Sequence, residues 1–266
     1  MRNCGWLIIE LAAEIYNQPT TFPISYHLFP IYKNCVMNNL QIYSQNYGLE
    51  LTNEAISRFS LYSDFLLEYN KKVNLTAIKE PDEVEIKHFL DSIVPLSLVQ
   101  IPENAKIADV GTGPGFPAIP MLIMRNDLKF TLIEATGKKL TFIEQLLLKL
   151  NLSAELLHKR GEEAGREPLY REKFDFVTAR AVADLKELAE YCLPLVKKGG
   201  KMLALKGNIT DEELCGSRQM IRNLGGKITE IKKYSLPENN GRSLVIIEKT
   251  GATPKEYPRP TAKIKK

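Results

Sequence analysis

The stretch Lys106-Ile-Ala-Asp-Val-Gly-Thr-Gly-Pro-Gly-Phe-Pro117 joins a short apolar run to three alternate glycines, and a second apolar run follows it. This order predicts a β-strand, a tight turn and the start of a helix. Glycine adopts positive φ angles and lets bare backbone approach a ligand, while Pro117 suits a first helical turn, where a backbone N–H would lack a partner. The pattern therefore predicts a turn that holds a nucleotide-like cofactor.

The spacing of these glycines narrows the kind of cofactor. A dinucleotide-binding turn follows G-x-G-x-x-G, and the place of its third glycine is taken here by Phe116. Asp109, two places before Gly111, makes the loop resemble instead the first motif of the class I S-adenosylmethionine (SAM) methyltransferases. Glu134 ends the next predicted strand, where its carboxylate can accept hydrogen bonds from both hydroxyls of a ribose. A solvated strand-end charge is the alternative interpretation of Glu134.

Length and composition bound the rest of the chain. Its 266 residues are 44% hydrophobic, which is enough for one sizeable core with a small appendage. No apolar run approaches the roughly 18 residues of a membrane span, so we expect a soluble protein. The four cysteines have neither C-x-x-C spacing nor nearby histidine pairs, so we expect no metal site and a reduced, cytoplasmic setting.

Hydrophobic periodicity divides the chain into parts. Apolar residues at helical spacing predict one helix over 52–70 behind a Thr52 cap and a second from Pro81 to about Val99. Met37 is predicted to be the native start. The expected parts are a non-native or disordered extension over 1–36, a helical portion over 37–104, a SAM-binding catalytic domain over 105–250 and a basic tail over 251–266.

Beyond residue 105, predicted strands alternate with helices. The strands are expected at 106–110, 129–134, 154–158, 174–179, 201–206, 227–234 and 243–248. Gly199-Gly200 and Gly225-Gly226 are predicted to stop helices. This alternation predicts an α/β fold with a Rossmann-like, mostly parallel seven-stranded sheet and helices on both faces. Ligands of such sheets bind beyond the carboxyl ends of the strands.

The loops at those strand ends are poor in catalytic bases. They hold no histidine, no Ser/His/Asp or Cys/His set and no clustered carboxylates, so hydrolysis and metal chemistry are not indicated. Methyl transfer needs only in-line alignment, which contributes ~7–11 kcal/mol. The segment from Thr178 to Val182 lacks the Asn/Asp-Pro-Pro motif of amine methylases, and neither Cys192 nor Cys215 lies at a strand end. Guanine N7, which loses no proton on methylation, is compatible with these loops.

Several ordered motifs together resemble the bacterial RsmG (GidB) family, guanine-N7 methyltransferases of small-subunit ribosomal RNA. The likeness covers roughly 37–266 and leaves the first 36 residues without a counterpart. Its motifs, besides the glycine loop, are Asn70-Lys-Lys-Val-Asn-Leu-Thr76, His88-Phe-Leu-Asp-Ser92, Arg160-Gly-Glu-Glu163, Thr178-Ala-Arg-Ala-Val182, Leu205-Lys-Gly207, Gly241-Arg-Ser-Leu-Val-Ile-Ile-Glu-Lys249 and Tyr257-Pro-Arg259.

The resemblance implies the residues of the site. Gly161 departs mildly from the family, which often has alanine there. Arg180 and Lys206 are expected to position the substrate, with no general base. The implied SAM contacts are Gly111, Phe116, Glu134, Ala135, Thr136, Gly161, Glu162 and Arg180.

The resemblance also implies the partner, which would be 16S rRNA or the small ribosomal subunit. We expect neither a membrane nor a metal as a partner, and we expect a monomer. His88 is expected to pack in the core rather than to line the cleft, and Arg242 is a weaker candidate for a phosphate or guanine O6 contact. Lys71, Lys72, Lys79 and the basic tail are candidate RNA contacts or solvated charges. A methyltransferase of another acceptor, a non-catalytic ribosome-assembly factor and, more remotely, a nicotinamide dehydrogenase remain open.

Overall fold

The computed structural model describes residues 37–180 and 183–264, which belong to one compact unit; the proposed extension over 1–36 lies outside them. The helices are α2 Asn38–Gln45, α3 Asn53–Asn70, α4 Pro81–Glu83, the π-helix η1 Val84–Leu90, α5 Asp91–Ile93, α6 Pro95–Leu98, α7 Ala118–Met124, α8 Gly137–Leu150, α9 Gly161–Ala164, α10 Leu185–Cys192, α11 Asp211–Asn223 and α12 Thr261–Ile264. The strands are β1 Lys106–Val110, β2 Lys129–Ile133, β3 Glu155–Leu157, β4 Phe174–Arg180, β5 Val196–Lys206, β6 Gly226–Leu236 and β7 Asn240–Lys249.

The seven strands form one sheet in the order β3-β2-β1-β4-β5-β7-β6, with β7 antiparallel to both of its neighbours. The central strands are apolar because both of their faces are covered, as in β1, where Ile107, Ala108 and Val110 are all buried. In β1 and β2 the pairing runs in step from Lys106 with Lys129 to Val110 with Ile133, so the two strands end side by side. The predicted α/β fold with a mostly parallel sheet is confirmed.

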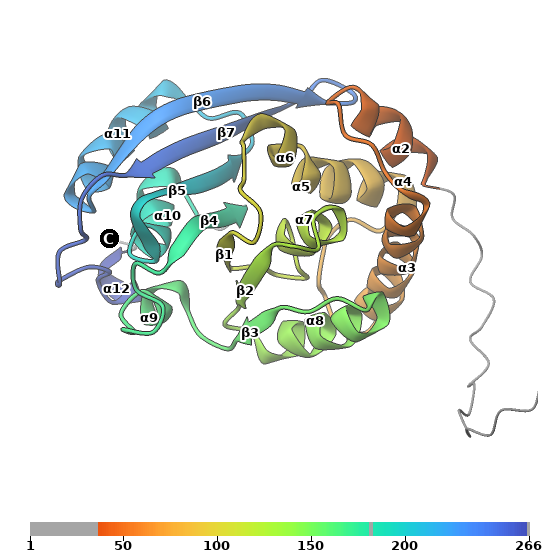
Figure 1. Cartoon of the computed structure of the whole chain (residues 1–266), viewed down its shortest axis with the longest axis horizontal. Coiled ribbons are helices and arrows are strands. Elements are labelled where there is room, and N and C mark those ends of the chain that lie inside the picture. The colour runs from red at the N-terminus through yellow and green to blue at the C-terminus, as the bar shows by residue number, and fades with distance from the viewer. Residues whose placement is uncertain (1–36, 181–182, 265–266) are drawn as a thin grey trace, which may run out of the picture. The chain divides into compact units, whose positions relative to one another are not determined.

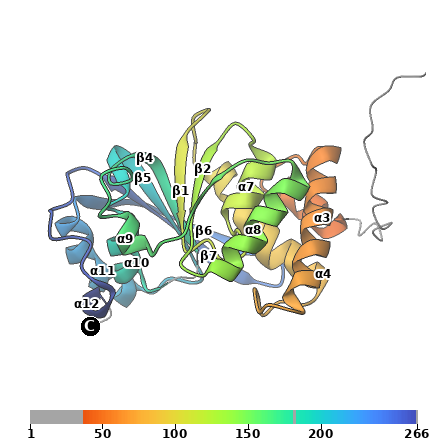
Figure 2. The ribbon, with the colours of Figure 1, turned by 90° about the horizontal axis from the view of Figure 1, so that it is seen from below.

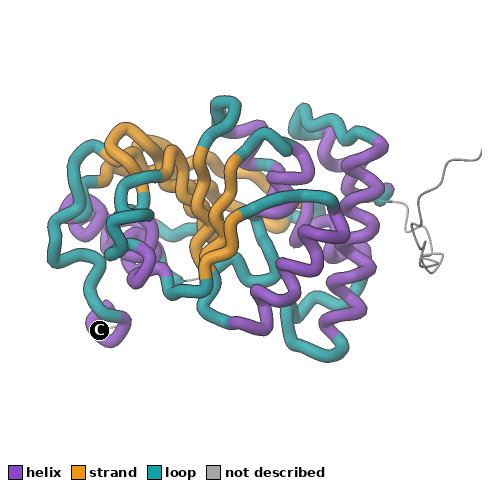
Figure 3. Tube along the Cα trace, turned by 60° about the horizontal axis from the view of Figure 1, so that its bottom comes forward, coloured by secondary structure: helices purple, strands orange, loops and turns teal. Residues whose placement is uncertain are grey.

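Helices cover both faces of this sheet (Figures 1 and 2). On one face α3, α7 and α8 pack in a core that includes Tyr62, Ile119 and Leu146, and on the other α10 and α11 pack in a core that includes Leu188 and Leu214. Figure 3 shows the strands in orange between helices on either side. Among the described residues, none of the helices combines the length and the apolar character that a bilayer crossing requires.

The N-terminal helices are not an independent layer. Phe59 and Tyr62 of α3 are fully buried, and Tyr62 stacks on Phe116 of the glycine loop with the ring centroids 5.3 Å apart. Thr52 caps α3 as predicted, since its side-chain oxygen accepts a hydrogen bond from the Ala55 N–H. The helical portion is therefore part of the support of the cofactor loop.

The expected helix over 81–99 is present as the consecutive elements α4, η1, α5 and α6, with π-helical hydrogen bonding over Val84–Leu90 and one interruption at Val94, because Pro95 has no N–H to continue the helix and begins α6. Another prediction of local structure was wrong. Gly199-Gly200 does not stop a helix, because α10 ends at Cys192 and the glycines lie within β5. Gly225, with φ at +78°, does follow the end of α11.

Candidate cofactor site at the carboxyl ends of β1 and β2

The glycine loop turns sharply because three of its residues have positive φ angles: Gly111 at +68°, Gly113 at +60° and Gly115 at +104°. The Gly111 N–H donates to the Ile133 carbonyl over 2.9 Å, which ties the loop to the end of β2. A Cβ at Gly115 would lie 2.5 Å from Ile119 Cδ1, whereas one at Gly113 would meet nothing closer than 4.0 Å. Gly115 is therefore required by packing, and Gly113 leaves its side of the loop open to a ligand.

Glu134 joins the first two strand-end loops. Its Oε2 accepts a hydrogen bond from the Gly113 N–H over 3.0 Å, and its Oε1 accepts one from the Thr136 N–H over 2.8 Å. The side chain is buried, and an ionised carboxylate still has free lone pairs after two such bonds. Glu134 can therefore accept from ribose hydroxyls while its orientation is fixed by the backbone.

A cavity of about 190 Å³ lies beside these loops. Glu162 of α9 is buried in its wall, and its Oε1 accepts a hydrogen bond from the Thr261 hydroxyl. The residues that line it are Val110, Gly111, Ile133, Glu134, Ala135, Lys159, Arg160, Gly161, Glu162, Ala183, Glu187, Tyr191 and Thr261. Two buried carboxylates and a bare glycine backbone around one cavity fit an adenosine cofactor, whose hydroxyl and amine groups are donors.

Gly161 has a packing reason to be glycine in this chain. A Cβ there would lie 2.8 Å from Val110 Cγ1 and 3.3 Å from Tyr191 Cβ. An alanine, common at this place in the resembled family, would require Val110 or Tyr191 to shift.

Phe116 lies differently from what its expected role suggests. The ring is only 4% exposed, with Tyr62 stacked on it at 5.3 Å and His88 at 4.4 Å between centroids. The Arg180 guanidinium carbon lies 4.9 Å from the same ring centroid. These side chains cover the ring, so the expected cofactor contact of Phe116 would be made through its backbone.

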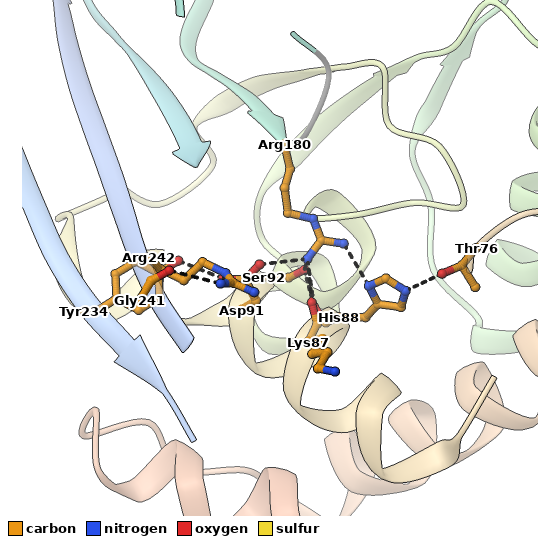
Figure 4. Close-up of polar contacts among 9 residues, drawn as sticks. All are labelled: Thr76, Lys87, His88, Asp91, Ser92, Arg180, Tyr234, Gly241 and Arg242. Carbon is orange, nitrogen blue, oxygen red and sulfur yellow. Dashed lines mark hydrogen bonds and ion pairs between the residues drawn. The ribbon is translucent and has the colours of Figure 1, made fainter. Parts of the chain in front are cut away.

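Arg180 extends from the end of β4 into a polar cluster (Figure 4). Its Nη1 lies 3.3 Å from Asp91 Oδ2 and 3.2 Å from Ser92 Oγ, and it also donates to the carbonyls of Lys87 and His88 over 3.3 Å. These partners sit on η1 and α5, so the guanidinium fastens the N-terminal helices to the sheet. Arg180 therefore has a structural role that the sequence pattern did not indicate.

The Arg180 cluster also fixes the tautomer of His88. An arginine only donates, so His88 Nδ1, 3.3 Å from Arg180 Nη2, must accept, and Nε2 carries the proton toward Thr76 Oγ1 at 2.7 Å. Burial, and then the charge of Arg180, lower the pKa of His88 to about 3. The imidazole is thus neutral and fully engaged, as expected for a packing residue.

The other basic candidates are also paired. Lys206 Nζ donates to the Ala183 carbonyl over 2.8 Å and lies 2.9 Å from Glu213 Oε1, and Arg242 Nε lies 3.3 Å from Asp91 Oδ1. In the basic tail, Arg259 binds Glu190, while Lys265 and Lys266 lie outside the described residues. Lys71, Lys72 and Lys79 are exposed. Lys206 and Arg242 are therefore each paired with a carboxylate of the protein itself.

Asp109 lies behind the glycine loop at the end of β1. Its side chain is fully buried, and its Oδ1 accepts a hydrogen bond from the Thr178 hydroxyl over 2.7 Å. Burial raises the pKa of this carboxyl to about 7, against the opposing effect of the Thr112 and Thr178 hydroxyls. Over residues 37–180 and 183–264, no group of three or more His, Cys, Asp or Glu is placed to hold a metal ion.

Sequence reasoning missed Tyr62, Asp91 and Thr261. The Tyr62 hydroxyl donates to the Pro114 carbonyl over 2.5 Å and so supports the glycine loop from α3. Asp91 pairs with both Arg180 and Arg242. The sequence did show that Asp91 and the residues near Thr261 lie in or next to motifs of the resembled family. Those motifs do not indicate which residues these side chains contact.

Comparison with known proteins places these features in context. The model of the GidB family, described as rRNA small subunit methyltransferase G, matches residues 55–242. Proteins named ribosomal RNA small subunit methyltransferase G are 45% identical over 217 residues in Desulfitobacterium hafniense (81% of this chain, 90% of that protein) and in Lactobacillus acidophilus (80% and 90%). A solved structure of a SAM-dependent methyltransferase from Aquifex aeolicus is similar at 18% identity, with a TM-score of 0.48 over 68% of this chain and 97% of that chain.

Proposed function

Because this chain belongs to the GidB family of rRNA small subunit methyltransferases G, we propose that it transfers the methyl group of SAM to N7 of a guanine in 16S rRNA. The observation that carries the proposal is the cavity at the sheet's carboxyl edge, where an open glycine turn faces the buried carboxylates of Glu134 and Glu162. Action on ribosomal RNA would place the reaction in the cytoplasm, and we expect a monomer.

The protein's part in this reaction is to hold and align. SAM supplies a methyl group on a sulfonium centre, which is already electrophilic. The backbone of Gly111 would lie against the cofactor, and Glu134, held by the N–H groups of Gly113 and Thr136, would accept from its ribose, with Ala135 and Thr136 alongside. Glu162, on a wall with Gly161, would take a further donor of the cofactor. Alignment of this kind is worth ~7–11 kcal/mol of the barrier.

The expected substrate-positioning residues would act through their neighbours. Lys206 holds the carbonyl of Ala183, which lines the cavity, and Arg180 holds the carbonyls at 87 and 88 and the carboxylate of Asp91. The in-plane lone pair of guanine N7 attacks without losing a proton, so no side chain has to act as a general base. The paired state of these cations is consistent with such indirect roles.

The test is incubation of the purified protein with labelled SAM and unmodified small subunits or their naked RNA, followed by nucleoside mass spectrometry. We expect 7-methylguanosine. Whether it appears with the small subunit, with the naked RNA or with both shows which of them is the substrate. A different methylated nucleoside would overturn the guanine-N7 assignment and keep the cofactor. SAM binding without any transfer to RNA would instead favour the assembly-factor reading or a non-RNA acceptor.

A pair of variants makes this test specific to the site. Glu134→Gln keeps the shape of the side chain but removes the charge and one acceptor oxygen from the two backbone N–H groups it binds. We expect SAM affinity to fall by about tenfold or more, because hydrogen bonds to a charged acceptor are about twice as strong as neutral ones. Glu144→Gln, an exposed position on α8, is the matched control and should bind SAM like the wild type.

A further inference from the structure

The C-terminal segment 253–264 returns to the cofactor cavity after the last strand of the sheet. Thr261 of α12 lines that cavity together with Glu162 of α9, and the Thr261 hydroxyl donates to the Glu162 carboxylate. We propose that this segment is a clamp that closes one wall of the cofactor cavity, and that Thr261 is the positioning residue for Glu162. The inference rests on the proposed function, because it assigns Glu162 to a cofactor contact.

An ion pair with a buried carboxylate holds the clamp in place. Arg259 makes a bidentate pair with Glu190 of α10, with Nη2 to Oε2 at 2.7 Å and Nε to Oε1 at 2.9 Å, and its own backbone N–H donates to the same carboxylate over 2.7 Å. Glu190 is 1% exposed, and a buried carboxylate needs such a partner. Arg259 of the basic tail thus serves an internal ion pair.

Further bonds fix the backbone of the clamp. Arg171 donates to the carbonyls of Thr253 and Tyr257 over 2.8 Å and to that of Pro254 over 3.1 Å. Arg166 donates to the Pro258 carbonyl over 2.8 Å. A segment held at four carbonyls between Thr253 and Pro258 and at Glu190 presents its next residues in one place, and Thr261 is among them.

Thr261 is well suited to orient Glu162. Within residues 37–180 and 183–264, its hydroxyl is the only hydrogen-bond partner of that carboxylate, which is 7% exposed. An ionised carboxylate has about four lone-pair sites. One bond from Thr261 therefore selects a side-chain orientation and leaves the remaining sites to donors of the cofactor.

The experiment compares three variants of the full chain. Thr261→Val keeps the shape but loses the hydroxyl, Thr261→Ser keeps the hydroxyl, and Thr229→Val removes an exposed hydroxyl from the outer strand β6 as a matched control. SAM binding is measured by calorimetry, methyl transfer to small-subunit RNA by steady-state kinetics, and stability by thermal unfolding.

We expect Thr261→Val to raise the Kd and KM for SAM by about tenfold, with kcat at saturating SAM within about twofold of the wild type. Thr261→Ser and Thr229→Val should match the wild type. An unchanged Kd in Thr261→Val would overturn the inference while the proposed function stands. So would a loss of affinity that comes with a large fall in Tm and is not restored by serine, since that result indicates packing. A wild-type protein that bound no SAM would overturn both.

Discussion

At the scale of single residues, the pKa values of two ionisable groups near the glycine loop, His88 and Asp109, are shifted in opposite directions. The pKa of His88 is lowered to about 3, so the folded protein keeps this imidazole neutral while the unfolded chain takes up a proton near pH 6.5. The pKa of Asp109 is raised to about 7, so the folded protein keeps this proton while the unfolded chain loses it near pH 3.8. Their effects on stability therefore have opposite signs.

Between about pH 4 and pH 6.5 the His88 shift makes the free energy of unfolding rise with pH, and the Asp109 shift makes it fall. A variant that lacks one of the two groups should show the pH dependence that the other group causes. We expect Asp109→Asn to leave a rising curve and His88→Gln a falling one, each by up to about 1.4 kcal/mol per pH unit relative to the background of the remaining groups. Urea unfolding at several pH values measures this, and parallel curves for the two variants would refute it.

Residue identity alone could not predict these states. Asp109 is part of the sequence motif, yet its burial depends on the strands beside β1 and the helices that cover the sheet. The partners of the Phe116 ring could not be predicted for the same reason, because Tyr62 and His88, which cover that ring, are 54 and 28 residues away in the sequence. Local patterns encode the turn of the backbone, whereas the partners of a side chain are set by contacts between distant segments.

At the scale of elements, two glycines of the glycine loop are needed for different reasons, one for tight packing and one for access by a ligand. Gly115 has φ at +104° and no room for a side chain, because Ile119 and Tyr62 lie against it. Gly113 also has positive φ but faces open space. Gly115 serves the packing of the loop on α3 and α7, and Gly113 serves access for a ligand.

Gly115→Ala and Gly113→Ala should therefore fail in different ways. We expect Gly115→Ala to lower the free energy of unfolding by about 2–4 kcal/mol through strain and overpacking. Gly113→Ala should lower it by only about 1–2 kcal/mol, the cost of a left-handed alanine, but weaken SAM binding because the methyl group enters the open side. Denaturant unfolding and calorimetric titration of both variants test this, and equal losses of stability would contradict it.

Elements with a clear period were the most predictable. Leu140, Ile143, Leu146, Leu147 and Leu150 recur at helical spacing in the sequence and are all buried on α8. The internal structure of the helical region 81–98 was less predictable, since a π-helix and a proline in the middle of the segment interrupt its periodicity. The bends in this region matter to the site, because they bring Asp91, Ser92 and the carbonyls at 87 and 88 to the guanidinium of Arg180.

At the scale of the whole molecule, one buried lysine links parts that are distant in sequence. Lys249 of β7 is 1% exposed, and its Nζ donates to the Leu193 carbonyl and to Thr253 Oγ1, each over 2.6 Å, and lies 3.1 Å from Glu172 Oε1. Burial lowers the pKa of Lys249, and Glu172 acts in the opposite direction. This contact joins the last strand, the end of α10 and the beginning of the C-terminal segment.

Lys249→Met should unfold the molecule more easily, because it leaves the Leu193 carbonyl without this donor and Glu172 without its ammonium partner. We expect a loss of about 2–3 kcal/mol in the free energy of unfolding, because the lysine end of the pair is buried while water can still reach Glu172. Lys227→Met, at an exposed position on β6, should change it by less than about 0.5 kcal/mol. Comparable values for the two variants in urea unfolding would argue against this role for Lys249.

The order of the strands places β3 and β6 at the two margins of the sheet, where backbone N–H and C=O groups are left without a neighbouring strand. Such margins invite the strands of other molecules and so promote aggregation. β3 limits the risk by being only three residues long. β6, with 11 residues, carries Lys227, Glu230, Lys232 and Lys233 and has a bulge near Glu230, and both features discourage intermolecular pairing. The strand that completes the sheet thus also makes its own margin a poor template for a strand of another molecule.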